Sequence, residues 1–134
     1  KRYLGFWITT PVAYEIDRQC VVTDKVPGSL KDLKILTLDC QDLKLNLDVV
    51  KEIDMFNVND RVRLIISKEK PEYTNNDFCA HGYIFYEKRQ DSDSKYISLI
   101  SLYGLIVKIL SDEGIIKKGT LNMMDHVYLC LRRS

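Results

Sequence analysis

The feature that most constrains the fold is a period of two in apolar residues, which recurs in short runs along the chain. Residues 43–49 are the clearest example, because leucine and valine alternate there with Lys44 and Asn46. Residues 61–66 and 127–131 show a similar alternation. Successive side chains of a strand point to opposite faces, so this period predicts strands that bury one face and expose the other to water.

Other apolar runs extend this pattern to most of the chain. They predict strands at 78–87, 95–102 and 105–110, and a less clear pair at about 14–22 and 33–40. Polar or glycine-containing turns separate the runs, at 27–29, 57–60, 71–77, 90–94 and 103–104. Seven or eight short strands at intervals of roughly ten residues indicate an all-β antiparallel barrel or sandwich. Helical signal is poor: 48–56 could form one helical turn, but Val49, Val50 and Ile53 suit a strand as well.

Length and charge bound the organisation and the partners. The 134 residues predict a single β-barrel domain over 1–134, with 1–12 as a candidate N-terminal extension. Lys and Arg number 20 against 19 Asp and Glu, so the formal net charge is only +1. Dedicated nucleic-acid binders usually carry a strongly basic face, so this balance counts against that class. No apolar run approaches the 18 or so residues that a membrane span needs.

Four cysteines are widely and irregularly spaced, at Cys20, Cys40, Cys79 and Cys130. We expect reduced thiols, as in an intracellular protein, rather than a disulfide framework. A zinc site would need Cys79, Cys130 and the two histidines at 81 and 126 to converge. The sequence lacks the C-x-x-C knuckles typical of structural zinc sites, so we predict no metal.

Catalytic motifs are absent from the sequence. It contains no G-x-S-x-G, H-E-x-x-H, G-x-x-x-x-G-K-[ST] or G-x-G-x-x-G pattern. Paired acids such as Asp91 with Asp93, or Asp112 with Glu113, lie in polar turns. We expect them to be solvated there, whereas a catalytic carboxyl group usually needs burial to shift its pKa. We therefore predict a protein that is not an enzyme, with no catalytic residues and no cofactor.

An alternative is a free-standing protein that binds single-stranded nucleic acid. Such barrels stack bases on exposed rings in a charged groove. The candidates are the rings of Tyr83, Phe85, Tyr86 and Tyr96 and the cations Arg61, Arg63, Lys88 and Arg89.

Five motifs in the same order resemble the small subunit shared by the eukaryotic nuclear RNA polymerases I, II and III. Residues 44–49, Lys-Leu-Asn-Leu-Asp-Val, are similar to that family's Lys-Leu-Thr-Leu-Asp-Ile strand, and 60–67 resemble its next strand. In 78–87 the matching residues are Phe78 and Gly82. Residues 101–109, Ser-Leu-Tyr-Gly-Leu-Ile-Val-Lys-Ile, are similar to its glycine hairpin, with Tyr103 in place of the first glycine. The terminal Tyr-Leu-Cys-Leu-Arg-Arg resembles its last strand.

The resemblance implies an oligonucleotide/oligosaccharide-binding-type (OB-fold-like) antiparallel β-barrel of about eight strands. It implies a non-catalytic, nuclear subunit that docks on the largest polymerase subunit and supports assembly of the transcribing enzyme. It further implies a monomer within a hetero-oligomeric complex with other polymerase subunits, without zinc or other cofactor, membrane contact or direct nucleic-acid contact.

We predict that the partner interface lies in the 101–107 hairpin and the C-terminal strand, where the matching motifs concentrate. An edge strand at 126–133 could also pair with a strand of the partner. The alternative is that Gly104 serves only the turn, and Leu129 and Leu131 only the core. The predicted interface residues are Ser101, Leu102, Tyr103, Gly104, Leu105, Tyr128, Arg132 and Arg133.

Overall fold

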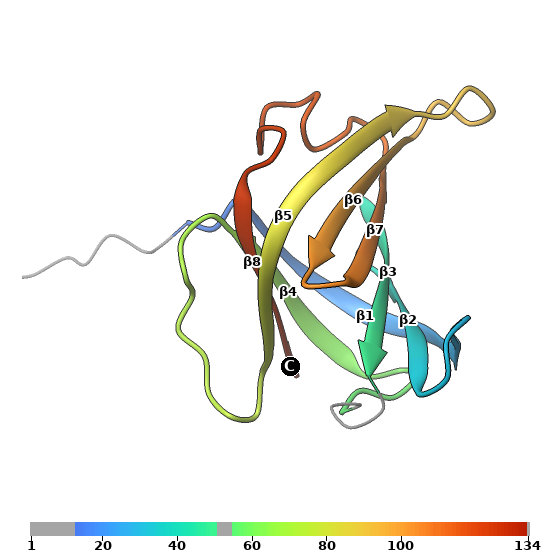
Figure 1. Ribbon diagram of the computed structural model, residues 1–134, viewed down its shortest axis with the longest axis vertical. Helices are drawn as coiled ribbons and strands as arrows, with labels where there is room; N and C mark the ends of the chain where they lie inside the picture. The colour runs from blue at the N-terminus through green and yellow to red at the C-terminus, as the bar shows by residue number, and fades with distance from the viewer. Residues whose placement is uncertain (1–12, 51–54, 134) are drawn as a thin grey trace, which may run out of the picture.

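The computed structural model describes residues 13–50 and 55–133, which form a closed antiparallel barrel (Figure 1). The candidate extension at 1–12 lies outside the described residues. Around the barrel the strands follow the order β1-β2-β3-β7-β6-β5-β8-β4, and β4 pairs with β1 to close it. The strands are β1 (Ile16–Pro27), β2 (Leu33–Asp39), β3 (Leu43–Val50), β4 (Arg61–Ser67), β5 (Phe78–Arg89), β6 (Tyr96–Leu102), β7 (Leu105–Ser111) and β8 (His126–Arg133).

The alternation of apolar residues fills the interior of the barrel. In β3 the side chains of Leu45 and Leu47 have no exposed surface, whereas Lys44, the residue before Leu45, is exposed to solvent. Each buried leucine contributes about 1.5–3 kcal/mol through the removal of its apolar surface from water. The largest fully buried side chains are Leu36, Leu38, Leu45, Leu47, Leu64, Ile65, Ile66, Ile84, Ile100, Ile109, Leu121 and Leu129. The predicted all-β class and barrel are confirmed.

The C-terminal strand completes the barrel. β8 lies between β4 and β5 and pairs antiparallel with both, with Leu129 opposite Ile66 on one side and Ala80 on the other. Its backbone groups therefore have partners on both sides. The prediction that 126–133 offers a free edge to a partner strand is wrong, because closure of the barrel uses both edges.

The end of β1 differs from the sequence prediction. β1 continues to Pro27, past the expected end near residue 22, through an irregularity in its pairing between Val22 and Asp24. The described residues contain no helix, and hence none that could span a membrane. The segment 48–56, which could have formed a helical turn or a strand, falls partly on β3 and partly on 51–54, which lie outside the described residues.

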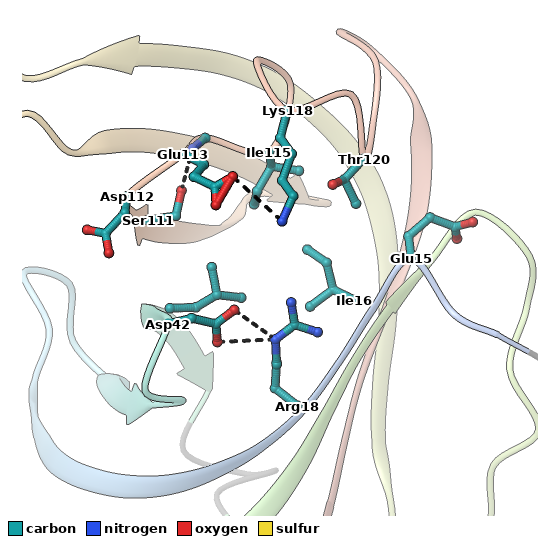
Figure 2. A pocket seen from close by; sticks show the side chains of 12 residues that line it. Glu15, Ile16, Arg18, Asp42, Ser111, Asp112, Glu113, Ile115, Lys118 and Thr120 are labelled. Atoms are coloured by element: carbon teal, nitrogen blue, oxygen red, sulfur yellow. Dashed lines mark hydrogen bonds and ion pairs between the residues drawn. The ribbon is translucent and has the colours of Figure 1, made fainter.

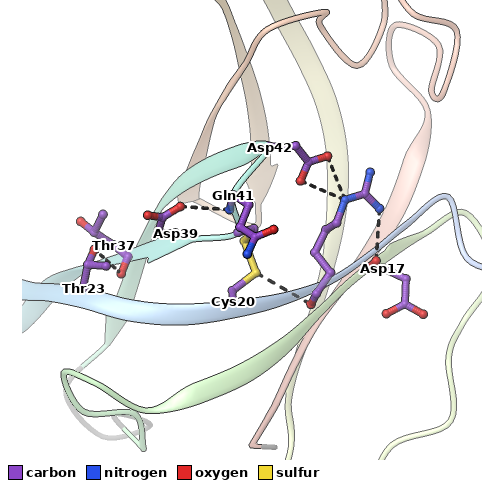
Figure 3. Close-up of a disulfide and its surroundings, with 9 residues drawn as sticks. Asp17, Cys20, Thr23, Thr37, Asp39, Gln41 and Asp42 are labelled. Carbon is purple, nitrogen blue, oxygen red and sulfur yellow. Dashed lines mark hydrogen bonds and ion pairs between the residues drawn. A yellow bond between two sulfur atoms is a disulfide. The ribbon is translucent and has the colours of Figure 1, made fainter.

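All four cysteines form disulfides, so the prediction of reduced thiols is wrong. Cys20 of β1 bonds to Cys40 after β2, and both residues lie in the core (Figure 3). Cys79 bonds to Cys130 on the outer side of β5 and β8, where the register places the two residues directly opposite each other. The spacing of the cysteines along the chain does not indicate either disulfide, because the pairing depends on which strands are neighbours.

One glycine is required where β5 meets β6. A Cβ atom added to Gly82 would lie 1.7 Å from the carbonyl oxygen of Ser101, well inside van der Waals contact. The neighbouring pair Tyr83 and Ser101 marks the start of the β5–β6 ladder. Any side chain at this position would push the two backbones apart.

We predict that Gly82→Ala destabilises the barrel by about 3 kcal/mol or more, because backbone cannot move aside as a flexible side chain can. Gly104→Ala is the matched control: a Cβ there meets nothing within 4 Å. Its cost should be about 1–2 kcal/mol, from the positive φ of 92° alone. Urea unfolding of the three proteins measures both values, and equal stability of the two variants would contradict the steric argument.

We also predict that reduction destabilises the protein. The disulfide-bonded cysteines are separated by 20 and 51 residues along the chain. The chain-entropy estimate gives about 3 kcal/mol for Cys20–Cys40 and about 4 kcal/mol for Cys79–Cys130. Urea unfolding with and without a dithiol reductant, on wild type and on Cys20→Ala/Cys40→Ala, separates the two contributions. Recovery of four alkylated thiols from protein blocked at lysis would show that the disulfides are absent.

Candidate partner-docking surface

A cluster of aromatic rings covers the outer side of β5 and β8 beside the β6–β7 hairpin. We call it the aromatic face, and its members are His81, Tyr83, Tyr103, His126 and Tyr128. His81 is the central ring: its centroid lies 4.8 Å from that of Tyr103, 5.1 Å from that of His126 and 5.5 Å from that of Tyr128. Tyr83 packs edge-on against His126 with the centroids 5.2 Å apart.

Polar contacts connect the same rings. The Nδ1 atom of His81 lies 3.0 Å from Nε2 of His126, so one imidazole donates a hydrogen bond to the other. The hydroxyl of Tyr103 lies 3.4 Å from the same Nδ1 atom. These contacts join the hairpin to the two strands across the barrel surface. Rings held in place before binding lose less conformational entropy when a partner docks on them.

Two members of the aromatic face are exposed, and the other three are half-buried. The side chains of Tyr103 and Tyr83 expose 75% and 46% of their surface. Further exposed apolar residues lie on β5, on β7 and in the turn before β8, namely Phe85, Tyr86, Ile106, Met123 and Met124. Large exposed apolar patches mark interaction sites in soluble proteins, so these residues make this side of the barrel a docking candidate.

The other half of the barrel, formed by β4, β1, β2 and β3, has a different outer surface. There Arg63 donates two hydrogen bonds to Asp17, at 2.9 and 2.7 Å, and Arg18 pairs with Asp42 at 3.0 Å. The hydrogen bonds from Arg63 hold the pKa of Asp17 below its ordinary value. Charges paired within the protein have less to offer a partner, so the aromatic face is the better docking candidate.

The structure brings together some of the predicted interface residues. Tyr103 and Tyr128 both contact His81, and Gly104 adopts a positive φ in the hairpin beside them. Ser101 lies opposite Tyr83 and is half-buried, as is Leu105.

Three predicted residues do not join this cluster. Leu102 points into the core with 2% of its surface exposed. Arg132 pairs with Asp77 at 3.3 Å, and Arg133 pairs with Asp60 at 3.7 Å. His81 was not among the predicted interface residues. Its signal was the spacing Cys79-x-His81-x-Tyr83, which places all three on one side of a strand.

The zinc arrangement considered from the sequence does not form. Cys79 and Cys130 bond to each other, and Cys130 lies four residues from His126 on the same strand. Four residues of strand span about 13 Å, too far for both side chains to reach one ion. The described part of the chain holds no group of three or more His, Cys, Asp or Glu that could bind a metal.

The structure separates some of the candidate nucleic-acid residues and brings others together. Tyr86, Lys88 and Arg89 of β5 line one hollow, which also includes the carboxylate-bearing residue Asp91. Tyr83, Phe85 and Tyr86 are exposed on β5, whereas Arg61 and Arg63 lie on β4, with β8 between the two strands. Arg63 is already bound to Asp17. The rings and these two cations therefore do not share one groove.

A polar hollow of about 100 Å³ lies between β1, the β2–β3 turn and the residues after β7 (Figure 2). Its charged groups include two ion pairs: Arg18 contacts Asp42, and Lys118 contacts Glu113 at 3.9 Å. The twelve lining residues include no His or Cys. The hollow therefore resembles a surface depression lined by ion pairs more than a catalytic centre.

Glu87 of β5 anchors the segment that follows β7. Its carboxylate accepts hydrogen bonds from the hydroxyl of Ser98 at 2.6 Å and from the backbone N–H groups of Ile115, Ile116 and Lys117 at 2.7–2.9 Å. Burial raises the pKa of Glu87, but the four hydrogen bonds outweigh it and hold the pKa below its ordinary value. The segment leading to Met123 and Met124 is thereby fixed to the sheet that carries the aromatic face.

The RpbG family of DNA-directed RNA polymerase subunits matches residues 15–134. The chain belongs to this family. Its curated relatives include DNA-directed RNA polymerase subunit Rpo8 of Sulfolobus acidocaldarius, which is 49% identical over 115 residues, or 85% of this chain and 94% of the relative. Rpo8 of Saccharolobus solfataricus is 40% identical over 127 residues, or 92% of this chain and 96% of the relative.

Rpo8 of Saccharolobus shibatae is 40% identical over 126 residues, or 91% of this chain and 96% of the relative. Among solved structures, the molybdate-binding protein ModG matches 92% of this chain and 94% of its own chain, at 11% identity and a TM-score of 0.34. That likeness is too low to support an inference. The RpbG match confirms the predicted kinship with an RNA polymerase subunit, and the relatives named here are archaeal.

We predict that Glu87→Gln lowers stability by about 1–3 kcal/mol at neutral pH, because the amide cannot accept all four hydrogen bonds. A lowered folded-state pKa means that the carboxylate stabilises the fold above its unfolded pKa. That contribution is lost as the pH falls through the folded pKa, so the gap between wild type and variant should close in acid. Glu113→Gln, at an exposed carboxylate in the same segment, should change stability by less than about 0.5 kcal/mol. Urea unfolding as a function of pH tests this, and a constant gap would contradict it.

Proposed function

We propose that the chain is a non-catalytic subunit of a DNA-directed RNA polymerase that docks on the largest subunit and supports assembly of the enzyme. The aromatic face carries this proposal. Three of its rings surround His81, they come from β8 and the β6–β7 hairpin, and Tyr103 is the most exposed large apolar side chain described. Membership in the RpbG family supplies the complex in which such a surface would be covered.

The residue types of this face match those of protein interfaces. Aromatic residues and methionine are enriched at the cores of interfaces, whereas Lys, Glu and Asp are depleted there. Tyr83, Tyr103 and Tyr128 provide large rings with a polar tip, which suits a contact that is partly wet. Closely spaced aromatic rings also tend to act as binding hot spots.

A catalytic role has no support among the described residues. Charged side chains that line the polar hollow pair with one another, Arg18 with Asp42 and Lys118 with Glu113. The four cysteines are disulfide-bonded, so they cannot act as thiolate nucleophiles. The subunit would therefore act through binding alone.

The resemblance noted in the sequence also predicts a nuclear subunit shared by polymerases I, II and III. The relatives named above are archaeal and support the polymerase role, not this sharing. Sharing among three enzymes and a nuclear location stay predictions.

Affinity purification of the tagged chain from its own cells should recover the largest polymerase subunit in near-equal amount. The variant Tyr103→Asp should recover much less, because an uncompensated carboxylate would be desolvated at the interface. Thr23→Asp, at an exposed position of β1 on the opposite half of the barrel, is the matched control. Recovery of no polymerase subunit by wild type would contradict the proposal, and tight, salt-sensitive binding to single-stranded DNA would favour the alternative.

A further inference from the structure

A second hollow borders the aromatic face. It has a volume of about 180 Å³ and lies between the 68–77 loop and the outer side of β5 and β8. We call it the side pocket. Small-molecule sites usually enclose roughly 300–1,000 Å³, so this volume suits one side chain of a protein partner better than a nucleotide or cofactor. Its lining residues are Lys70, Tyr73, Cys79, Ala80, His81 and Tyr128.

The side pocket is lined largely by rings and a disulfide, and Lys70 supplies a positive charge. Tyr73 and Tyr128 provide rings, and the Cys79–Cys130 disulfide lies at the β5–β8 junction beside them. The Nζ atom of Lys70 lies 5.5 Å from the centroid of the Tyr73 ring, a cation–π distance. The described residues that line the pocket include no carboxylate.

Carboxylates do lie close by, in a hollow next to the side pocket. That hollow is lined by Glu72, Tyr73, Thr74, Asp77 and Arg132, and there Asp77 already pairs with Arg132. The Arg132 guanidinium also donates to the carbonyl oxygen of Glu72. The acidic groups therefore line the other side of Tyr73, whereas the Lys70 ammonium has an aromatic neighbour and no acidic one among the residues of its pocket.

The loop that carries Lys70 is tied to the barrel. Asp77 at the end of the loop pairs with Arg132 of β8 at 3.3 Å and accepts a hydrogen bond from the backbone N–H of Thr74 at 3.0 Å, and Pro71 is buried. At its start, the backbone N–H of Lys68 donates to the carboxylate of Glu15 at 2.8 Å. The loop therefore presents Lys70 and Tyr73 from a defined position, which reduces the entropy that binding would cost.

We propose that the side pocket holds an acidic side chain of the largest polymerase subunit, with a neighbouring apolar residue of that segment on the aromatic face. This inference rests on the proposed function and specifies the partner's chemistry. A carboxylate would meet the Lys70 ammonium beside two rings, where the apolar surroundings strengthen the attraction. His81 and Tyr128 belong to both surfaces, so one short segment can occupy them together.

The test uses the assembled polymerase with a tagged largest subunit. Wild type and a variant of the chain compete for incorporation, and mass spectrometry measures their ratio in the complex. Lys70→Glu should be outcompeted by roughly tenfold, since a like charge would face the partner's carboxylate, and Lys70→Gln by less. Lys44→Glu, an exposed lysine on the outer side of β3, is the matched control and should compete within about twofold. Thermal unfolding of each variant alone checks that the barrel is intact.

The outcomes separate the two proposals. If wild type itself does not enter the complex, the proposed function fails. If wild type enters and Lys70→Glu competes as well as Lys44→Glu, the side-pocket inference fails while the function stands. Rescue of Lys70→Glu by changing one acidic residue of the largest subunit to lysine would support the inference directly. If Lys70→Glu is incorporated like wild type but the assembled polymerase that contains it binds RNA more weakly, the side-pocket inference is overturned. The occupant of the pocket would then be a phosphate.

Discussion

The pairing of β8 with both β4 and β5 is the interaction on which the rest of the structure depends. Without it the sheet would be open, and both β4 and β5 would expose an unpaired edge. Its register also sets the outer surface, because it places Cys79 opposite Cys130, His81 opposite Tyr128 and Tyr83 opposite His126. The disulfide, the histidine contact and the wall of the side pocket all follow from this one alignment.

The outer surface differs in chemistry from one part of the barrel to another. On β4 and β1, charged side chains such as Arg63 and Asp17 satisfy each other. On β5 and in the β6–β7 hairpin, rings that pack on other rings remain exposed, as Tyr83 and Tyr103 show. A free barrel gains nothing from such exposed rings. Under the proposed function, the same rings would become buried when the subunit assembles into the polymerase.

The sequence predicted the barrel but only part of the candidate site. Period-two patterns locate the strands, because burial on one face is a local property that leucines such as Leu45 and Leu47 record. The contacts of His81 with Tyr103 and Tyr128 and the bond between Cys79 and Cys130 depend on which strands are neighbours and in what register, and no local pattern contains that information. The same limit explains Leu102, which lies in a matching motif yet points into the core.

Side-chain footprinting with hydroxyl radicals, on the free subunit and on the assembled polymerase, tests the central claim most directly. Tyr83 and Tyr103 are exposed in the free barrel and should lose most of their labelling on assembly. Leu30 and Val58, which are exposed and lie outside the aromatic face, should label equally in both states. Unchanged labelling of the two tyrosines on assembly would contradict the account.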